Sequence, residues 1–305
     1  MGNIIAKSYQ LLADTTPDAI LVLGDTNSAL SAISAKRLKI PIFHMEAGNR
    51  CFDENLPEEI NRRIVDHISD VNLPYTEHAR RYLFAEGIKK EHVFVTASPM
   101  REVLSVQNQK IENSIILDQL NLKPKEYILL SAHREENIDN EKNFFELMNA
   151  INVIAENYKL PVIYSVHPRS KKIIAERHFK FRENVRTLEP FGFSDYIKLQ
   201  MNSLCVVSDS GTLAEESAIL NFPAVSIRTS TERPEVLDKG SFIIGSISPK
   251  SLLQSVDMAV RMSEHNEKNV LVQDYSDENV SVKIVKIIQS YTDIINRKVW
   301  QKSGN

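Results

Sequence analysis

The feature that most constrains this chain is a series of short, unbroken apolar runs separated by stretches with helical periodicity. Unbroken apolar strands are typical of parallel sheets, because helices cover both faces of such sheets. Segment 143–158, between two of the runs, has apolar residues at helical spacing. Repeated strand–helix units predict an α/β fold with doubly wound parallel sheets. The candidate strands are residues 19–25, 41–46, 71–75, 92–98, 127–133, 161–168, 185–190, 204–210 and 223–228.

The length of 305 residues is enough for two domains of roughly 150 residues each. A polar stretch at 103–126 lies between two strand–helix series, and we expect the domain boundary within it. The predicted domains are therefore 1–110 and 111–280. A long amphipathic pattern near the C-terminus predicts a helix over 281–305, which we expect to pack back on the first domain.

The composition argues against several classes of function. Apolar residues make up 42% of the chain and charged residues 25%, as in globular proteins. The net charge of −3 gives no basic surface for nucleic acid, and no apolar run reaches the roughly 18 residues of a membrane span. Cys51 and Cys205 are the only cysteines, without a CxxC pair. This argues against a disulfide framework or a cysteine zinc site and favours a reducing, cytoplasmic location.

The stretch HMEAGNRCFDENLPEEINR, residues 44–62, gathers five carboxylates, one His and two Arg. Glu46 ends one candidate strand as Asp25 ends another, and ligands bind at the carboxyl ends of parallel strands. Glu58 and Arg62 are four residues apart on a predicted helix, so they share a face. An Arg keeps a nearby carboxylate ionised and a second carboxylate lets it hold a proton, so this group could supply both a base and an acid. The alternative is an ordinary helix start, whose acidic residues favour the helix dipole.

A second candidate is SDSGTLAEE, residues 208–216, which follows an apolar run and opens a helical pattern. Backbone N–H groups at the start of a helix bind phosphate, and Gly211 beside Ser210 would let a ligand approach closely. Glu216 could accept hydrogen bonds from ribose hydroxyls. The alternative is a plain helix cap by Asp209 or Ser210.

A third candidate is SAHREEN, residues 131–137, in which His133 and Arg134 follow another apolar run. This is a second arrangement that could face phosphate, and its alternative is a capping His beside a surface charge pair. The loop TERPE, residues 231–235, adds Arg233 as a further group of the same kind.

A metal or a dinucleotide cofactor lacks its sequence signature. The sequence contains neither an HExxH motif nor a His pair at metal-binding spacing. There is also no GxGxxG motif. We therefore expect no metal and no cofactor. The side chains that could otherwise serve as metal ligands are His44, Glu46, Glu58, Asp66 and His67.

The motifs HMEAGNRCF, PEEINR, SAHREEN, SDSGTLAEE and TERPE occur here in an order that resembles the non-hydrolysing UDP-N-acetylglucosamine 2-epimerases. The resemblance implies two Rossmann-like domains that face a cleft, the arrangement called GT-B. It also implies a UDP-activated amino sugar as substrate, catalysis without a metal or nicotinamide, and a homodimer. The reaction would eliminate UDP to give a 2-acetamidoglycal and then add UDP back, with the proton delivered to the other face of C2.

The resemblance also assigns roles to residues. The carboxylates that move protons would lie in the first domain. Arg62 would keep Glu58 oriented and charged, and His133 would stabilise the departing UDP. The catalytic residues would be Asp25, Glu46, Glu58, Arg62 and His133, and the residues that bind UDP would be Arg134, Phe191, Ser210, Gly211, Glu216 and Arg233.

Within the family, the chain is most similar to the branch that makes UDP-N-acetyl-L-fucosamine for capsule or O-antigen. Members that act on UDP-N-acetylglucosamine carry HVEAGLRT where this chain has HMEAGNRCF. Asn49, Cys51 and Phe52 therefore become candidates for sugar specificity, with UDP-2-acetamido-2,6-dideoxy-L-talose as the substrate. The alternatives are a UDP-N-acetylglucosamine 2-epimerase, a hydrolysing epimerase, a GT-B glycosyltransferase and a UDP-sugar-binding protein without catalysis.

Family members begin with a strand and a GTRPE-type turn, whereas this chain begins with MGNIIAKSYQ. The resemblance implies that about two strand–helix units of the first domain, at about 30 residues per unit, are missing. Such a domain would expose apolar strand edges and lose part of its phosphate contacts. The expectation is that the 305-residue form is weakly active or inactive.

Overall fold

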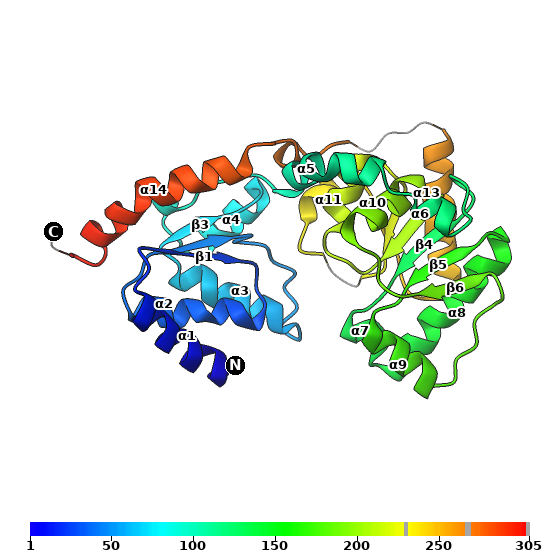
Figure 1. The fold of residues 1–305 in the computed structure, drawn as a ribbon, viewed down its shortest axis with the longest axis horizontal. Coiled ribbons are helices and arrows are strands. Elements are labelled where there is room, and N and C mark those ends of the chain that lie inside the picture. The colour runs from blue at the N-terminus through cyan, green and yellow to red at the C-terminus, as the bar shows by residue number, and fades with distance from the viewer. Residues whose placement is uncertain (229–230, 266–269, 303–305) are drawn as a thin grey trace. The chain divides into compact units, whose positions relative to one another are not determined.

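The computed structural model describes residues 1–228, 231–265 and 270–302, and the chain forms two compact units (Figure 1). The first unit consists of Met1–Glu102, Glu232–Glu235 and Gln273–Asn305, and the second of Val103–Thr231 and Val236–Val272. The unit boundary thus follows Glu102, inside helix α5 (Met100–Glu112), and not residue 110. The polar composition of the stretch after 103 reflects the exposed face of this helix rather than a linker.

The first unit contains a three-stranded parallel sheet in the order β1-β2-β3. Neighbouring residues of β2 serve opposite faces, as expected for a strand. Ile42 packs with Val22 and Val65, whereas Phe43 packs with Leu73 and with Ile284 of the C-terminal helix. The strands are β1 (Ile20–Leu23), β2 (Ile42–Met45) and β3 (Val71–Leu73), and the helices are α1 (Gly2–Thr15), α2 (Ser31–Arg37), α3 (Pro57–Ile68), α4 (Glu77–Ala85) and α14 (Val280–Lys298), with 3-10 turns at Asn27–Leu30, Lys90–His92 and Gln273–Tyr275.

β1 is an edge strand of this sheet. It pairs with β2 on one side, and its residues Leu21 and Leu23 remain 48% and 61% exposed. Apolar edge strands are prone to pair with other chains. Leu21 and Leu23 are thus two exposed apolar side chains on an edge strand of the first unit.

The second unit is built around a six-stranded parallel sheet in the order β6-β5-β4-β7-β8-β9. The strand order reverses between β4 and β7, and ligands of such sheets bind outside the carboxyl ends of the strands at this point. One face of the sheet is covered by α8 and α13, which share a core with the strands. The strands are β4 (Ile128–Ser131), β5 (Val162–Ser165), β6 (Val185–Leu188), β7 (Cys205–Ser208), β8 (Ala224–Ser226) and β9 (Ile243–Ile244).

The remaining helices connect these strands. No helix in the described ranges is long and apolar enough to cross a membrane. The helices are α6 (Ile116–Gln119), α7 (Glu135–Ile138), α8 (Glu141–Tyr158), α9 (Pro168–Glu176), α10 (Phe193–Asn202), α11 (Leu213–Leu220), α12 (Pro234–Asp238) and α13 (Pro249–Glu264).

The predicted strand at 92–98 was wrong. This segment forms one isolated bridge, between Val93 and Asn72, and Ala97 has a φ of 72°. That left-handed backbone ends an extended segment, whatever its apolar content. Each of the other eight predicted runs contains a strand, and the two-residue strand β9 was not expected.

Candidate active site

Asp25 and Glu46 follow the carboxyl ends of the neighbouring strands β1 and β2. Gly24 and Glu46 both have a left-handed backbone, with φ of 71° and 63°. A Cβ atom at Gly24 would lie 3.1 Å from Oε2 of Glu46, so the missing side chain leaves room for that carboxylate. The parallel pairing of the strands thus brings the two carboxyl groups to the same edge of the sheet.

Arg62 of α3 is almost fully buried and pairs with Asp25. Its Nη2 donates to Oδ2 of Asp25 and, at 3.3 Å, to Oε2 of Glu232, while its Nη1 donates to the carbonyl oxygen of Asn49 at 3.2 Å. The expected partner was Glu58, which is exposed in the first turn of α3. Arg62 instead pairs with two carboxylates that are largely shielded from water, where charges attract more strongly.

Asp25 has a strongly perturbed acidity. Burial raises its pKa, the positive charge of Arg62 lowers it, and the negative charges of Glu46, Glu232 and Glu58 raise it again, with a net pKa of about 6. A carboxyl group with this pKa exchanges protons near neutral pH and is suited to general acid–base catalysis.

Arg233 lies in the first unit, on the carboxylate of Glu46. Its Nη2 donates to Oε1 of Glu46 at 3.0 Å, and its guanidinium lies over the ring of Tyr75. Sequence reasoning expected Arg233 to bind UDP, but the segment Glu232–Glu235 returns to the first unit and places it beside a predicted catalytic group. Glu232 was missed, although the TERPE motif that contains it was noticed.

The three candidates for sugar specificity differ in their surroundings. Asn49 is buried, and its Nδ2 lies 3.4 Å from Oε1 of Glu46. Cys51 is held by Glu59, which accepts hydrogen bonds from its backbone N and its Sγ. Phe52 is 61% exposed, with its ring edge-on to Tyr82. Asn49 is therefore the candidate with a direct contact to Glu46, a predicted catalytic residue.

In the second unit, Asp209 organises the loop that carries His133. Asp209 is fully buried at the end of β7 and accepts hydrogen bonds from the backbone N of His133 and of Arg134 and from Nδ2 of Asn137. It also lies 3.1 Å from Nδ1 of His133, whose side chain remains 46% exposed. Because a carboxylate accepts hydrogen bonds, this contact places the proton on Nδ1 and presents Nε2 outward. Asp209 is thus a loop organiser and not the helix cap that the sequence allowed.

Ser210 and Gly211 lie in the turn between β7 and α11, whose N-cap residue Thr212 makes no side-chain cap hydrogen bond. The hydroxyls of Ser210 and Thr212 lie 3.0 Å apart. A Cβ atom at Gly211 would lie 3.7 Å from Nη1 of Arg228, so a cation lies beside this turn. A helix start next to a guanidinium forms a favourable anion-binding site. Arg228 was missed, although it is the last residue of a predicted strand.

The remaining residues that were predicted to bind UDP lie in α11 and in two loops of the second unit. Glu216 of α11 is buried; burial raises its pKa, and Gln200 donates to its Oε2 at 2.7 Å. Phe191 is half-buried in the loop between β6 and α10. Arg134, directly after His133, lies 3.8 Å from a carboxylate oxygen of Glu136.

A family model described as UDP-N-acetylglucosamine 2-epimerase matches residues 1–289. The chain belongs to this family. A curated UDP-N-acetylglucosamine 2-epimerase of Methanocaldococcus jannaschii is 34% identical over 294 residues, which cover 92% of this chain and 78% of that protein.

The solved structures agree with this assignment. A UDP-N-acetylglucosamine 2-epimerase from Rickettsia bellii has a TM-score of 0.91 and 47% identity, covering 99% of this chain and 81% of that one. The Methanocaldococcus jannaschii enzyme in complex with UDP-GlcNAc and UDP has a TM-score of 0.87 and 32% identity, covering 95% and 80%. The chain is thus a UDP-sugar 2-epimerase of the non-hydrolysing family, an isomerase with two Rossmann-like domains of the GT-B type.

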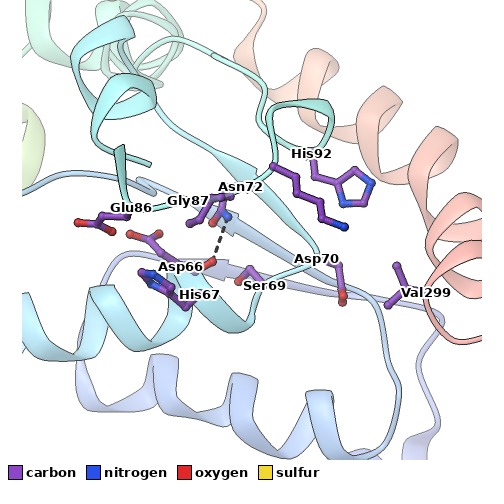
Figure 2. A pocket seen from close by; sticks show the side chains of 11 residues that line it. Asp66, His67, Ser69, Asp70, Asn72, Glu86, Gly87, His92 and Val299 are labelled. Atoms are coloured by element: carbon purple, nitrogen blue, oxygen red, sulfur yellow. Dashed lines mark hydrogen bonds between the residues drawn. The ribbon is translucent and has the colours of Figure 1, made fainter. Parts of the chain in front are cut away.

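The first unit of this epimerase also contains a pocket of about 290 Å³ that is lined mainly by polar residues and by none of the predicted site residues (Figure 2). Its carboxylates already have partners, such as Lys36 for Asp70 and Arg50 for Glu86. Within the described ranges, no group of three or more His, Cys, Asp or Glu side chains is arranged to hold a metal ion. The pocket is lined by Asp66, His67, Ser69, Asp70, Asn72, Glu86, Gly87, Ile88, Lys89, His92 and Val299.

Proposed function

We propose that this epimerase inverts C2 of a UDP-activated N-acetyl amino sugar through elimination and re-addition of UDP, with Asp25 and Glu46 as the proton-transferring pair. The observation that carries this proposal is the pair itself. Two carboxyl groups at adjacent strand ends share one environment with Arg62, and burial and neighbouring charges raise the pKa of Asp25 to about 6. Proton removal and return require groups that change protonation near neutral pH.

The proposed chemistry has two steps. In the first, a carboxylate takes the proton from C2, the C1–O bond to UDP breaks, and a double bond forms between C1 and C2. In the second, the phosphate oxygen of UDP re-forms the bond to C1 while a carboxyl group delivers a proton to the opposite face of C2. The reaction needs no oxidant and consumes no cosubstrate, since the product is an isomer of the substrate.

The second unit would hold the UDP that leaves and returns. The start of α11 and Arg228 supply donors and positive charge for the diphosphate, as helix starts do in nucleotide-binding folds. Asp209 orients His133 through Nδ1, so that a ring with hydrogen on both nitrogens can donate from Nε2 to the leaving phosphate oxygen and stabilise its developing charge. Glu216 would bind the ribose, and Phe191 would contact the uracil.

For the sugar, we propose UDP-2-acetamido-2,6-dideoxy-L-talose, which gives UDP-N-acetyl-L-fucosamine for capsule or O-antigen synthesis in the cytoplasm. The contact between Asn49 and Glu46 supports this choice. Asn49 is one of the positions at which this chain differs from HVEAGLRT, and it contacts the proposed catalytic carboxylate. The second candidate is UDP-N-acetylglucosamine, which the relatives' names and the complex of the Methanocaldococcus jannaschii enzyme favour.

The test is one reaction in deuterated water. The purified chain is incubated with UDP-N-acetyl-L-fucosamine and, in parallel, with UDP-N-acetylglucosamine. We expect deuterium at C2 with UDP still attached, because the proton removed exchanges with solvent before it returns. The nucleotide that becomes labelled faster identifies the sugar.

Two other outcomes of the deuterium experiment would contradict the proposal. Accumulation of free UDP and free sugar would instead indicate a hydrolysing enzyme. Absence of label in both nucleotides, with UDP bound, would overturn the proposed epimerisation. The variant Asn49→Leu should shift the preference toward UDP-N-acetylglucosamine, whereas an unchanged ratio would contradict the role of Asn49.

A further inference from the structure

His44 lies on β2, two residues before Glu46, and its side chain is fully buried. Its Nδ1 is 2.8 Å from Oδ1 of Asp66, and its Nε2 is 3.0 Å from the carbonyl oxygen of Gly24. A carbonyl oxygen accepts hydrogen bonds and cannot donate one, so Nε2 carries a hydrogen. A neutral imidazole has only one N–H group, so the contact with Asp66 decides the charge of the ring.

Asp66 is ionised in this environment. Its Oδ2 accepts hydrogen bonds from the backbone N of Gly48 at 3.1 Å and from Nη1 of Arg50 at 2.7 Å. Burial raises the pKa of Asp66, but the hydrogen bonds and charges of His44 and Arg50 outweigh burial and hold the pKa below its ordinary value. An ionised carboxylate only accepts hydrogen bonds, so Nδ1 of His44 also carries a hydrogen.

The charges around the ring support the same conclusion. Arg50 donates from Nε and Nη2 to Glu86, at 2.8 and 2.6 Å, and so links two carboxylates, Asp66 and Glu86. Figure 2 shows both carboxylates at one end of the polar pocket. With a neutral His44, two carboxylates would share one cation in a mostly buried cluster, which is costly. With a charged ring, two anions face two cations.

We propose that His44 is a buried imidazolium cation and acts as a positioning residue for the epimerisation, an inference that rests in its second part on the proposed function. Its Nε2 fixes the turn before Asp25. Its own strand leads directly into Glu46. Through Asp66 it fixes α3, one helical turn after Arg62. One charged ring thus connects the three chain segments that carry the proposed proton-transfer group.

The charge is what makes this connection. A neutral side chain of similar size, such as the amide in His44→Gln, cannot place N–H donors on both Asp66 and the carbonyl of Gly24. It would leave one buried acceptor without its donor. The turn before Asp25 or the end of α3 that carries Asp66 should then shift, and a displacement of about 1 Å at reacting groups can lower a rate roughly 100-fold.

The charge state can be measured without any turnover. The full chain is labelled with nitrogen-15 histidine, because a ring nitrogen with hydrogen and one without give well-separated signals. We expect both ring nitrogens of His44 to carry hydrogen in the folded chain, since each faces a hydrogen-bond acceptor. The signal is assigned by its loss in His44→Gln, with His67→Gln, at the exposed neighbour of Asp66, as the matched control. A His44 signal from a nitrogen without hydrogen at pH 7 would overturn the proposed charge.

The positioning role is tested by kinetics of the same two variants, after circular dichroism has shown that both are folded. We expect kcat of His44→Gln to fall about 10- to 100-fold, with UDP affinity within about threefold of the unsubstituted chain, since the proposed UDP site lies in the second unit. His67→Gln should retain full kcat. An unchanged kcat in folded His44→Gln would refute the positioning role. If the unsubstituted chain shows no turnover, the proposed function fails, and the nitrogen-15 result still decides the charge.

Discussion

Asp25 combines two properties that a surface aspartate lacks, a pKa of about 6 and a direct ion pair with Arg62. If it transfers the C2 proton, the rate should change with pH through about 6. Asp25→Asn keeps the size of the side chain but cannot exchange a proton, so we expect kcat to fall roughly 100- to 10,000-fold. The pH step near 6 should also disappear. Steady-state rates between pH 5 and 8 test this, and an Asp25→Asn variant that keeps the step would assign it to another group.

The same carboxyl group links stability to pH. Its folded pKa of about 6 lies above the ordinary value of 3.8, so the folded state holds the proton more tightly than the unfolded state. The stabilisation is complete below about pH 4 and is lost as the pH rises through 6.

Asp25→Asn should therefore gain stability relative to the unsubstituted chain between pH 4 and 7. The gain should be at most about 3 kcal/mol, since one pKa unit corresponds to about 1.4 kcal/mol. Urea unfolding at the two pH values measures it, with Asp18→Asn, at an exposed position, as the control. Equal pH slopes for the two variants would contradict the raised pKa.

At the scale of elements, two substitutions of Gly211 at the start of α11 distinguish the effect of side-chain volume on UDP binding from the effect of negative charge. A Cβ atom at Gly211 has room, with its contact to Arg228 at an ordinary 3.7 Å. Gly211→Ala should therefore fold normally, and any loss of UDP affinity would report how closely the diphosphate approaches the backbone. Gly211→Asp should add a carboxylate that pairs with Arg228 and repels the diphosphate.

We expect Gly211→Asp to weaken UDP binding about 10- to 100-fold more than Gly211→Ala does, because a charged hydrogen bond is replaced by repulsion. Titration calorimetry with UDP measures both affinities. Equal affinities in the two variants would show that the diphosphate binds elsewhere. Asp25→Asn, in the first unit, should leave the UDP affinity unchanged and serves as the control.

The edge strand β1 makes a prediction about association. Leu21 and Leu23 are exposed on a strand that has a paired neighbour on one side. The double variant Leu21→Lys and Leu23→Lys should reduce self-association of the 305-residue chain, since charges on an edge strand oppose pairing with another edge. Light scattering over a concentration series measures the change. Unaltered scattering, with unaltered circular dichroism, would exclude β1 as the associating surface.

At the scale of the whole molecule, the sequence predicted the strands of the fold well, but it did not predict which side chains pair with each other within the site. The eight strands that were expected and found are short apolar runs, and most of them are buried on both sides of a sheet, so their apolar character identifies them. Helical spacing placed Glu58 and Arg62 on one face, but it says nothing of a strand end such as Asp25 that lies across from them. Arg62 pairs with Asp25 because both side chains are largely buried, whereas Glu58 is exposed. Residue spacing along a helix does not predict such burial.

The position of Arg233 was not predictable for a different reason. The segment Glu232–Glu235 lies far along the chain among residues of the second unit, yet it belongs to the first. A sequence divided into two consecutive domains assigns such a segment to the wrong one. Arg228 and Asp209 were missed more simply, because each was read as part of a strand end or a cap.

The divided first unit also sets an order for biosynthesis. The second unit has all its residues once Val272 has been added, whereas the first still lacks Gln273–Asn305 at that moment. Tyr275, whose hydroxyl donates to Glu235 at 2.5 Å, and the core residues Val280 and Ile284 belong to that segment. Synthesis from the N-terminus therefore adds every residue of the second unit before the core of the first unit is complete.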